Sequence, residues 1–280
     1  MTDPEWFRRA LDAPVDTGTV RVEGVDIAYR AWGRVGDRMV ALVHGAAANA
    51  HWWDHIGPAL AQGHRVVALS LSGHGDSGRR SSYSYALWAR EVAALLEGCD
   101  QPIVVAHSMG GRVAYHLAAQ RPGLGGIAFI DTGFAGMPNA ASRAVFADLA
   151  ARPSRSYRTR EEAVAAFRPF GSTAPIADHL QRHIGGHSVR RVPEGWSWKF
   201  DPAVFHALTL PHAVSGPVLA PAALLRAGHG SVVIKEVLEA TRLVLPSDSV
   251  FETIPGSGHH VMLDAPLELV AWLRDLIRAW

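Results

Sequence analysis

Short apolar runs alternate with longer segments of helical periodicity over the first half of the chain. Continuous apolar runs are typical of parallel strands that are covered on both faces, and apolar positions three or four apart are typical of helices. The predicted strands are Val20–Glu23, Ile27–Trp32, Met39–His44, Arg65–Leu69, Pro102–Ala106 and Gly126–Ile130. The predicted helices are His51–Leu60, Tyr85–Leu96 and Ser108–Gln120. This order predicts an α/β fold: an open, mostly parallel sheet with helices on both faces.

The alternation stops after Asp131. Residues 132–212 show no clear strand, only helical segments separated by proline, glycine and serine. These segments are Ala140–Ala151, Glu161–Phe167 and Ile176–Ile184. Strand patterns return at Ala222–Arg226 and Ser249–Ile254, with helical patterns at Val232–Thr241 and Pro266–Trp280. We therefore expect a core domain of residues 1–131 and 213–280 that carries an inserted helical cap, residues 132–212.

Composition and charge narrow the possible partners. With 48% hydrophobic and 19% charged residues, the 280-residue chain has the composition of a packed globular protein. A net charge of +1 argues against nucleic acid and anionic membranes as partners. The single cysteine, Cys99, excludes an internal disulfide, and no apolar run reaches the ~18 residues that span a bilayer. The polar N-terminus lacks a signal-peptide pattern, so we expect a cytoplasmic protein and leave its oligomeric state open.

Ser108 is the candidate nucleophile. An apolar strand runs directly into this serine, a helix follows at once, and the small residues Ala106 and Gly110 stand two positions before and after it. A strained strand-to-helix turn needs such small neighbours, and it exposes the hydroxyl at the carboxyl end of the sheet. A serine at this position can also simply cap the helix. The strand before it and the helix after it favour the nucleophile.

Four segments in this order resemble motifs of the α/β-hydrolase fold superfamily. They are His44-Gly45-Ala46-Ala47, Ser72-Gly73-His74-Gly75-Asp76-Ser77, Ala106-His107-Ser108-Met109-Gly110-Gly111 and Pro255-Gly256-Ser257-Gly258-His259. The resemblance implies a serine hydrolase with a cap, in which the backbone N–H groups of Ala46 and Met109 form the oxyanion hole. It also implies that His259, directly after a glycine, is the base rather than its neighbour His260. The segment from Ser72 to Ser77 is expected to serve backbone geometry.

The acid that orients the base departs from the usual pattern. The resemblance puts Ser231 where most members carry aspartate, and no Asp or Glu lies between Asp201 and Glu236. Some members, including one branch of the haloalkane dehalogenases, carry the acid at the end of the sixth strand, which here is Asp131. Two interpretations stay open: Asp131 is the acid, or Ser231 or water orients the imidazole in a Ser-His dyad.

No cofactor is expected from the motifs. The chain lacks G-x-G-x-x-G and G-x-x-x-x-G-K-[ST], which bind nucleotides, and it lacks H-E-x-x-H. Helical spacing would align His179, His183 and His187, but we expect no metal there. The aromatic side chains around and within the cap should pack it onto the core or line an apolar pocket. They are Trp52, Trp53, Phe134, Phe146, Phe167, Phe170, Trp196, Trp198 and Phe200.

The sequence thus predicts a small-molecule hydrolase. Its substrate would be an ester, thioester or lactone with a small to medium, largely apolar acyl or alcohol part. The same residues could instead hydrolyse a carbon–carbon bond of a diketone-type substrate. A non-hydrolytic small-molecule receptor is the third possibility, made plausible by Ser231 at the usual acid position.

Overall fold

The computed structural model describes residues 2–134, 140–172, 175–210 and 216–280. Its main sheet has eight strands in the order β1-β2-β4-β3-β5-β6-β10-β11. Their bounds are β1 Asp16–Val22, β2 Val25–Trp32, β3 Arg38–Val43, β4 His64–Leu69, β5 Ile103–His107, β6 Gly126–Ile130, β10 Ala222–Ala227 and β11 Val250–Ile254. Strand β2 runs antiparallel to β1 and β4, and the remaining pairs are parallel. The predicted fold class is confirmed.

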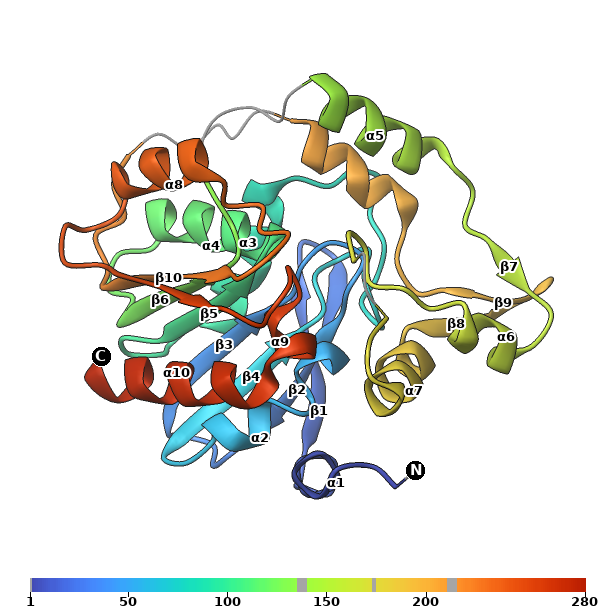
Figure 1. The fold of residues 1–280 in the computed structure, drawn as a ribbon, viewed down its shortest axis with the longest axis horizontal. Helices are drawn as coiled ribbons and strands as arrows, with labels where there is room; N and C mark the ends of the chain where they lie inside the picture. The colour runs from blue at the N-terminus through green and yellow to red at the C-terminus, as the bar shows by residue number, and fades with distance from the viewer. Residues whose placement is uncertain (1, 135–139, 173–174, 211–215) are drawn as a thin grey trace.

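Each face of this sheet buries its own hydrophobic cluster. In β3, Val40 and Leu42 belong to one cluster, whereas Ala41 and Val43 belong to the other. A strand that alternates between two buried faces must be apolar throughout, which explains the continuous run in the sequence. Helices α3 (Tyr85–Leu95), α4 (Met109–Gln120) and α8 (Lys235–Arg242) lie on one side of the sheet, and α2 (Gly57–Leu60) and α10 (Pro266–Ala279) on the other (Figure 1).

The segment between β6 and β10 contains helices and also a small sheet. Its elements are α5 Ala140–Ala151, β7 Ser156–Tyr157, α6 Arg160–Ala165, α7 Asp178–His187, β8 Val189–Val192, β9 Gly195–Trp198 and the 3₁₀ helix η2 Pro202–Thr209. The expectation of a segment without strands was wrong, because β7, β9 and β8 form a three-stranded antiparallel sheet. These strands are short, and β8 exposes Arg190 and Arg191, so they leave no apolar alternation in the sequence.

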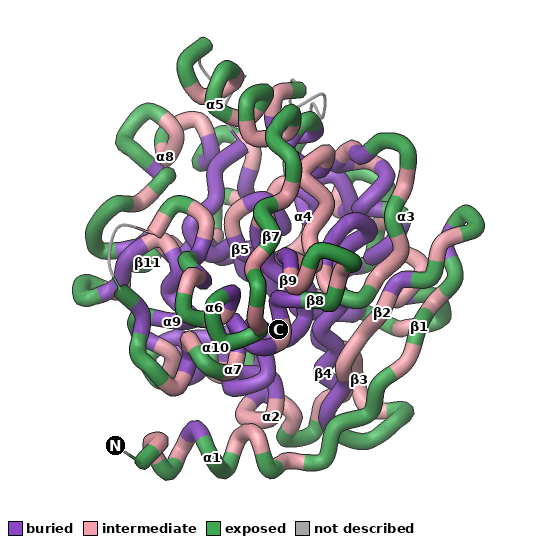
Figure 2. The backbone as a smooth tube through the Cα atoms, turned by 90° about the vertical axis from the view of Figure 1, so that its right-hand side faces the viewer, coloured by how far each residue is buried: buried purple, intermediate pink, exposed green. Residues whose placement is uncertain are grey.

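The division into a core and a cap stays a prediction. Its second boundary, between residues 212 and 213, lies outside the described residues. Within the cap, α5 has no buried residue, whereas α7 buries Leu180 and Ile184. Figure 2 shows the same contrast between a largely exposed α5 and the buried strands of the main sheet. No helix in the described part of the chain has the length and apolarity needed to cross a membrane.

Three further elements frame the sheet. The N-terminal helix α1 (Glu5–Leu11) buries Phe7 against the same face as α2 and α10. The 3₁₀ helix η1 (Ala50–Trp53) follows β3, and the short helix α9 (Val261–Asp264) follows β11. Because β3, β5, β6, β10 and β11 are parallel, the loops after them meet at one edge of the sheet, where open α/β sheets bind ligands.

Candidate active site

Ser108 stands at the sharp turn between β5 and α4. Its φ of 51° lies in the left-handed region, which a non-glycine residue rarely adopts. The turn brings α4 close to β3, because a Cβ built on Gly110 would lie 2.6 Å from the carbonyl oxygen of His44 and 2.7 Å from that of Val43. The backbone N–H of Ser108 donates to the carbonyl of Ile130 at 3.0 Å. The predicted strand-to-helix turn is therefore present, with its serine at the carboxyl edge of the sheet.

His259 comes from the loop between β11 and α9 and contacts both partners that the sequence suggested. Its Nε2 lies 3.0 Å from Ser108 Oγ, and its Nδ1 lies 2.7 Å from Asp131 Oδ2. The backbone carbonyl of His259 accepts a hydrogen bond from His107 Nε2 at 2.9 Å. Burial lowers the pKa of His107 well below its usual value, so this imidazole is neutral and its Nε2–H is the donor. His107 thus fixes the loop that carries His259.

Asp131 is fully buried directly after β6 and adopts a φ of 41°. Its Oδ1 accepts hydrogen bonds from the backbone N–H of Ala227 at 2.9 Å and from the Ser231 hydroxyl, and its Oδ2 lies 3.2 Å from the N–H of Val232. Burial opposes ionisation, but the hydrogen bonds from His259, Ala227 and Ser231 outweigh it and hold the pKa of Asp131 below its ordinary value. Ser231, at the usual acid position, therefore donates to the carboxylate that contacts His259.

The two amides of the expected oxyanion hole border the same cavity as the serine. Ala46 follows Gly45 in the loop after β3, and Met109 is the first residue of α4. A Cβ on Gly45 would lie 2.9 Å from His107 Nδ1 and 3.2 Å from Ser108 Cβ, so glycine permits this loop to approach the serine closely. Within the described ranges, neither the N–H of Ala46 nor that of Met109 has a hydrogen-bond acceptor. Both groups are thus available to a ligand.

The cavity beside Ser108 has a volume of about 450 Å³ and is lined by residues of the predicted core and of the predicted cap. Its large apolar side chains are Trp52, Phe146, Phe170 and Leu208. A second cavity of about 260 Å³ under the cap shares Trp52 and Phe170 and adds Phe167, Trp198 and Phe200. Other aromatic residues named from the sequence pack elsewhere: Phe134 contacts Phe129 and Tyr115, and Trp196 pairs with Tyr157 in the cap sheet.

One side chain of the cavity was missed by the sequence analysis. Arg112 of α4 borders the cavity and is its only Lys, Arg, Asp or Glu among the described lining residues. The signal was present, because residues four apart on a helix share a face, and Arg112 follows Ser108 by four positions. Arginines at such positions are common on exposed helix faces, so the sequence alone does not place Arg112 at the cavity.

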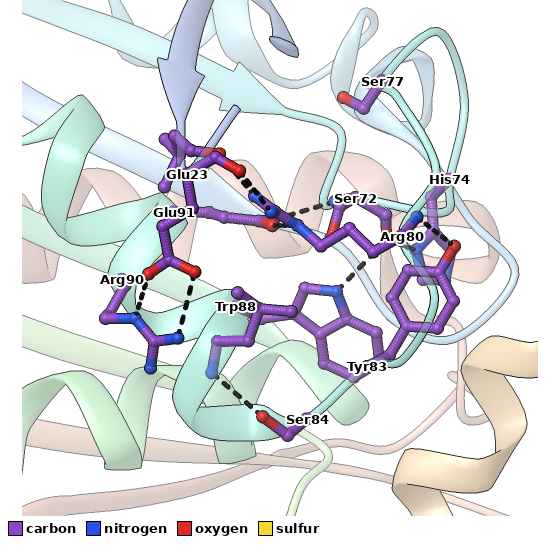
Figure 3. A network of polar contacts seen from close by, with 12 residues as sticks. Glu23, Ser72, His74, Ser77, Arg80, Tyr83, Ser84, Trp88, Arg90 and Glu91 are labelled. Carbon is purple, nitrogen blue, oxygen red and sulfur yellow. Dashed lines mark hydrogen bonds and ion pairs between the residues drawn. The ribbon is translucent and has the colours of Figure 1, made fainter. Parts of the chain in front are cut away.

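The turn after β4 serves the backbone, as expected for Ser72–Ser77. The backbone N–H of Ser72 donates to Glu91 at 2.8 Å, and its carbonyl accepts from Trp88 Nε1 at 3.1 Å. Glu91 is fully buried and pairs with Arg80 at 3.0 Å. Figure 3 shows how these side chains of α3 converge on the turn. The turn is therefore held by a structural hydrogen-bond network, and no hydrogen bond between described residues joins it to the hydroxyl of Ser108.

A second polar cluster joins the cap to the core. Asp54 lies after η1 and is 3% exposed. One of its oxygens, Oδ2, lies 2.8 Å from His51 Nδ1 and 2.8 Å from Nε2 of His183, which belongs to α7 of the cap. The other oxygen accepts from Arg30 Nε of β2 at 2.6 Å. No sequence pattern predicts this cluster, because Asp54 and His183 are 129 residues apart.

The histidines of α7 do not converge as their spacing suggested. His179 packs its ring edge against Phe7, whereas His183 and His187 turn toward His51. Ligand atoms of His51, His183 and His187 lie within 4.8 Å of one another. The rings of His51 and His187, however, stack with an interplanar angle of 9°, so their nitrogen lone pairs lie in two nearly parallel planes, 3.9 Å apart at the ring centres. A second group of three comprises His107, His259 and His260.

Comparison with known proteins agrees with this architecture. Residues 40–272 match the alpha/beta hydrolase family. The esterase Rv0045c of Mycobacterium tuberculosis is 29% identical over 271 residues, which cover 92% of this chain and 88% of that protein. The structure of E-2-(acetamidomethylene)succinate hydrolase superposes with a TM-score of 0.81 at 20% identity, covering 95% of this chain and 100% of that one.

A thioesterase domain from the curacin biosynthetic pathway superposes with a TM-score of 0.77 at 21% identity, covering 94% of this chain and 99% of that chain. At such identities the two structural matches establish the fold only. The family match begins in β3 and ends in α10, and so includes the turn at Ser108, Asp131 and the loop of His259. On the fold, the site and this match together, the chain belongs to the alpha/beta hydrolase family.

Proposed function

We propose that this protein is a serine hydrolase that cleaves an ester, thioester or lactone through an acyl-enzyme. The observation that carries the proposal is the position of His259 between two partners, with Nε2 at 3.0 Å from Ser108 Oγ and Nδ1 at 2.7 Å from Asp131. A carboxylate against Nδ1 keeps the proton on that nitrogen. The lone pair of Nε2 is then free to accept the proton of the serine hydroxyl.

In the proposed reaction, Ser108 Oγ attacks the carbonyl carbon while His259 Nε2 takes its proton. The negative charge that develops on the carbonyl oxygen is stabilised by the N–H groups of Ala46 and Met109. Removal of one donor of this kind lowers turnover by about 10²- to 10³-fold in serine hydrolases. His259 then protonates the leaving group, and water, activated by the same imidazole, releases the acyl group from Ser108.

Labelling with a fluorophosphonate tests the nucleophile. We expect intact-mass spectrometry to show one adduct on the wild-type protein, with the label on the peptide that contains Ser108. The variant Ser108→Ala should take up no label, while Ser82→Ala, which changes an exposed serine before α3, should react like wild type. A wild-type protein that stays unlabelled and does not hydrolyse p-nitrophenyl butyrate would refute the proposal.

The receptor interpretation loses its main support. It depended on Ser231 at the usual acid position, but the Asp131 carboxylate lies against His259 instead. Hydrolysis of a carbon–carbon bond would use the same Ser108 and His259, and no contact of the described residues favours it. Profiling p-nitrophenyl esters against β-diketones separates these two reactions.

A further inference from the structure

Arg112 points to a charged group on the substrate. Ser108 and Arg112 are one helical turn apart at the start of α4, and both border the 450 Å³ cavity. Arg112 lies in the first turn of α4, which begins directly after Ser108, so the same helix start brings both side chains to this cavity. Apolar and aromatic side chains line much of the cavity, and its other polar side chains are imidazoles and hydroxyls, so none of the described lining residues carries a carboxylate that could pair with this cation.

No acidic side chain neutralises Arg112. Its Nε donates to the carbonyl of Gly133 at 3.4 Å and its Nη1 to the hydroxyl of Tyr85 at 3.3 Å. Both distances are long for a hydrogen bond, and both acceptors are neutral. No Asp or Glu contacts the guanidinium among the described residues, and the sequence places none at positions 1, 135–139, 173–174 or 211–215.

Two other arginines with little exposed surface have an acidic partner, whereas the half-buried Arg121 and Arg274 donate to backbone carbonyls and do not border this cavity. Arg30 pairs with Asp54 at 2.6 Å, and Arg80 pairs with Glu91 at 3.0 Å. Two imidazoles beside the cavity add no charge of their own, because burial lowers the pKa of His260 to about 4 and the pKa of His107 well below its ordinary value, so both are neutral at pH 7. A cation without a counter-ion at the edge of an apolar cavity is unfavourable until an anion pairs with it.

We propose that Arg112 binds a carboxylate of the substrate. The substrate would be an ester or thioester that carries a carboxylate a short chain away from the scissile carbonyl, with an apolar remainder against Trp52 and Phe170. The planar fork of donors on a guanidinium matches the two oxygens of a carboxylate. This inference rests on the proposed serine hydrolase activity and refines the largely apolar substrate expected from the sequence.

Matched substrates test the subsite. On the acyl side, monomethyl succinate differs from methyl butyrate by a carboxylate in place of the terminal methyl group. On the alcohol side, 3-acetoxypropanoate differs from propyl acetate in the same way. With acid release followed in a pH-stat, we expect kcat/KM to favour the charged member of at least one pair by about 10- to 100-fold, the value of a hydrogen-bonded charged pair.

The variants are chosen to separate charge from shape. Arg112→Met should abolish the preference for the charged substrate, and Arg112→Lys, which keeps the charge but loses the fork, should retain part of it. Arg278→Met removes an exposed arginine of α10 that pairs with Asp275, and it should keep the wild-type ratio. A ratio near one for both substrate pairs, or a ratio that Arg112→Met leaves intact, overturns the inference.

A binding measurement separates this inference from the proposed hydrolysis. In the Ser108→Ala background, calorimetry should show that N-methylsuccinamate binds about 10-fold more tightly than N-methylbutanamide. The difference should vanish in the double variant with Arg112→Met. Equal binding of both amides refutes the carboxylate subsite even if Ser108 is labelled and active. A preserved difference without labelling of Ser108 refutes the hydrolase and leaves the subsite standing.

Discussion

Replacing Asp131 by Asn tests how the buried carboxylate acts. The backbone N–H of Ala227 and the hydroxyl of Ser231 both donate to Oδ1, so an asparagine must keep its oxygen at that position. Its NH₂ group then takes the place of Oδ2 and faces His259 Nδ1, 2.7 Å away in the wild-type protein. Two N–H groups cannot face each other, so the imidazole moves its proton to Nε2. In that tautomer it cannot accept the proton of Ser108.

The expected loss follows from this tautomer. Loss of the correct tautomer lowers turnover by about 10⁴-fold in serine proteases, which corresponds to about 5 kcal/mol of transition-state stabilisation. We expect a similar fall in kcat for Asp131→Asn with p-nitrophenyl butyrate, while circular dichroism shows an unchanged fold. Ser231→Ala is the matched control. It removes one donor to Asp131 but leaves the carboxylate against His259, so kcat should fall by less than about 10-fold.

The reasoning is refuted by either of two results. If Asp131→Asn retains more than about a tenth of the wild-type kcat, the carboxylate does not set the tautomer of His259. If kcat falls equally in Asp131→Asn and Ser231→Ala, then turnover depends on the whole set of hydrogen bonds around Asp131. The contact between Asp131 and His259 then has no larger effect on kcat than the others.

Two further predictions concern stability. Gly110→Ala places a Cβ 2.6 and 2.7 Å from the backbone oxygens of His44 and Val43, so thermal unfolding should show a loss of about 2 kcal/mol, whereas Gly256→Ala, with no atom within 4 Å, should lose much less. Burial lowers the pKa of His44 from 6.5 to about 4, so the unfolded chain binds more protons in this window, and this group contributes about 3 kcal/mol to the fall in stability as the pH drops from 7 to 4. Other histidines whose pKa is lowered by burial, such as His55 and His74, add to this fall. His44→Gln keeps an acceptor for the N–H of Leu71 and should reduce this dependence in urea titrations by the share of His44. A pH dependence equal to that of the wild-type protein would contradict the contribution of His44.

The sequence was most informative where the chain is buried on both sides. Strands such as β3 and β5 are apolar throughout, and their predicted bounds differ from the observed ones by one residue at each end. The helix α1 was not predicted because it has only seven residues, and because its N-cap residue, Pro4, has no side chain that can accept a hydrogen bond from the first turn. The cap strands were missed because their pairing, such as Tyr157 with Trp196, depends on contacts between distant segments.

The candidate site shows the same division between local and distant information. Ser108 and His259 stand in local patterns of small residues that a single sequence reveals. Asp131 contacts His259 across 128 residues of sequence and accepts a hydrogen bond from Ser231 across 100 residues. A single sequence does not reveal such distant contacts, so it left Asp131 and Ser231 as alternative partners of His259. Arg112 was overlooked because an unpaired cation is recognised only when its surroundings are known.

The cluster around Asp54 has a consequence for how ligands reach the cavity. Asp54 holds His183 of the cap together with His51 and Arg30 of the core, and separating them would leave a buried carboxylate short of partners, at about 3–5 kcal/mol. At the far end of the cap, α5 has no buried residue among those described, and its half-buried Phe146, Leu149 and Ala150 are the apolar side chains that pack inward. Any opening of the cap is therefore expected to pivot about α7, so that ligands enter and leave beneath α5.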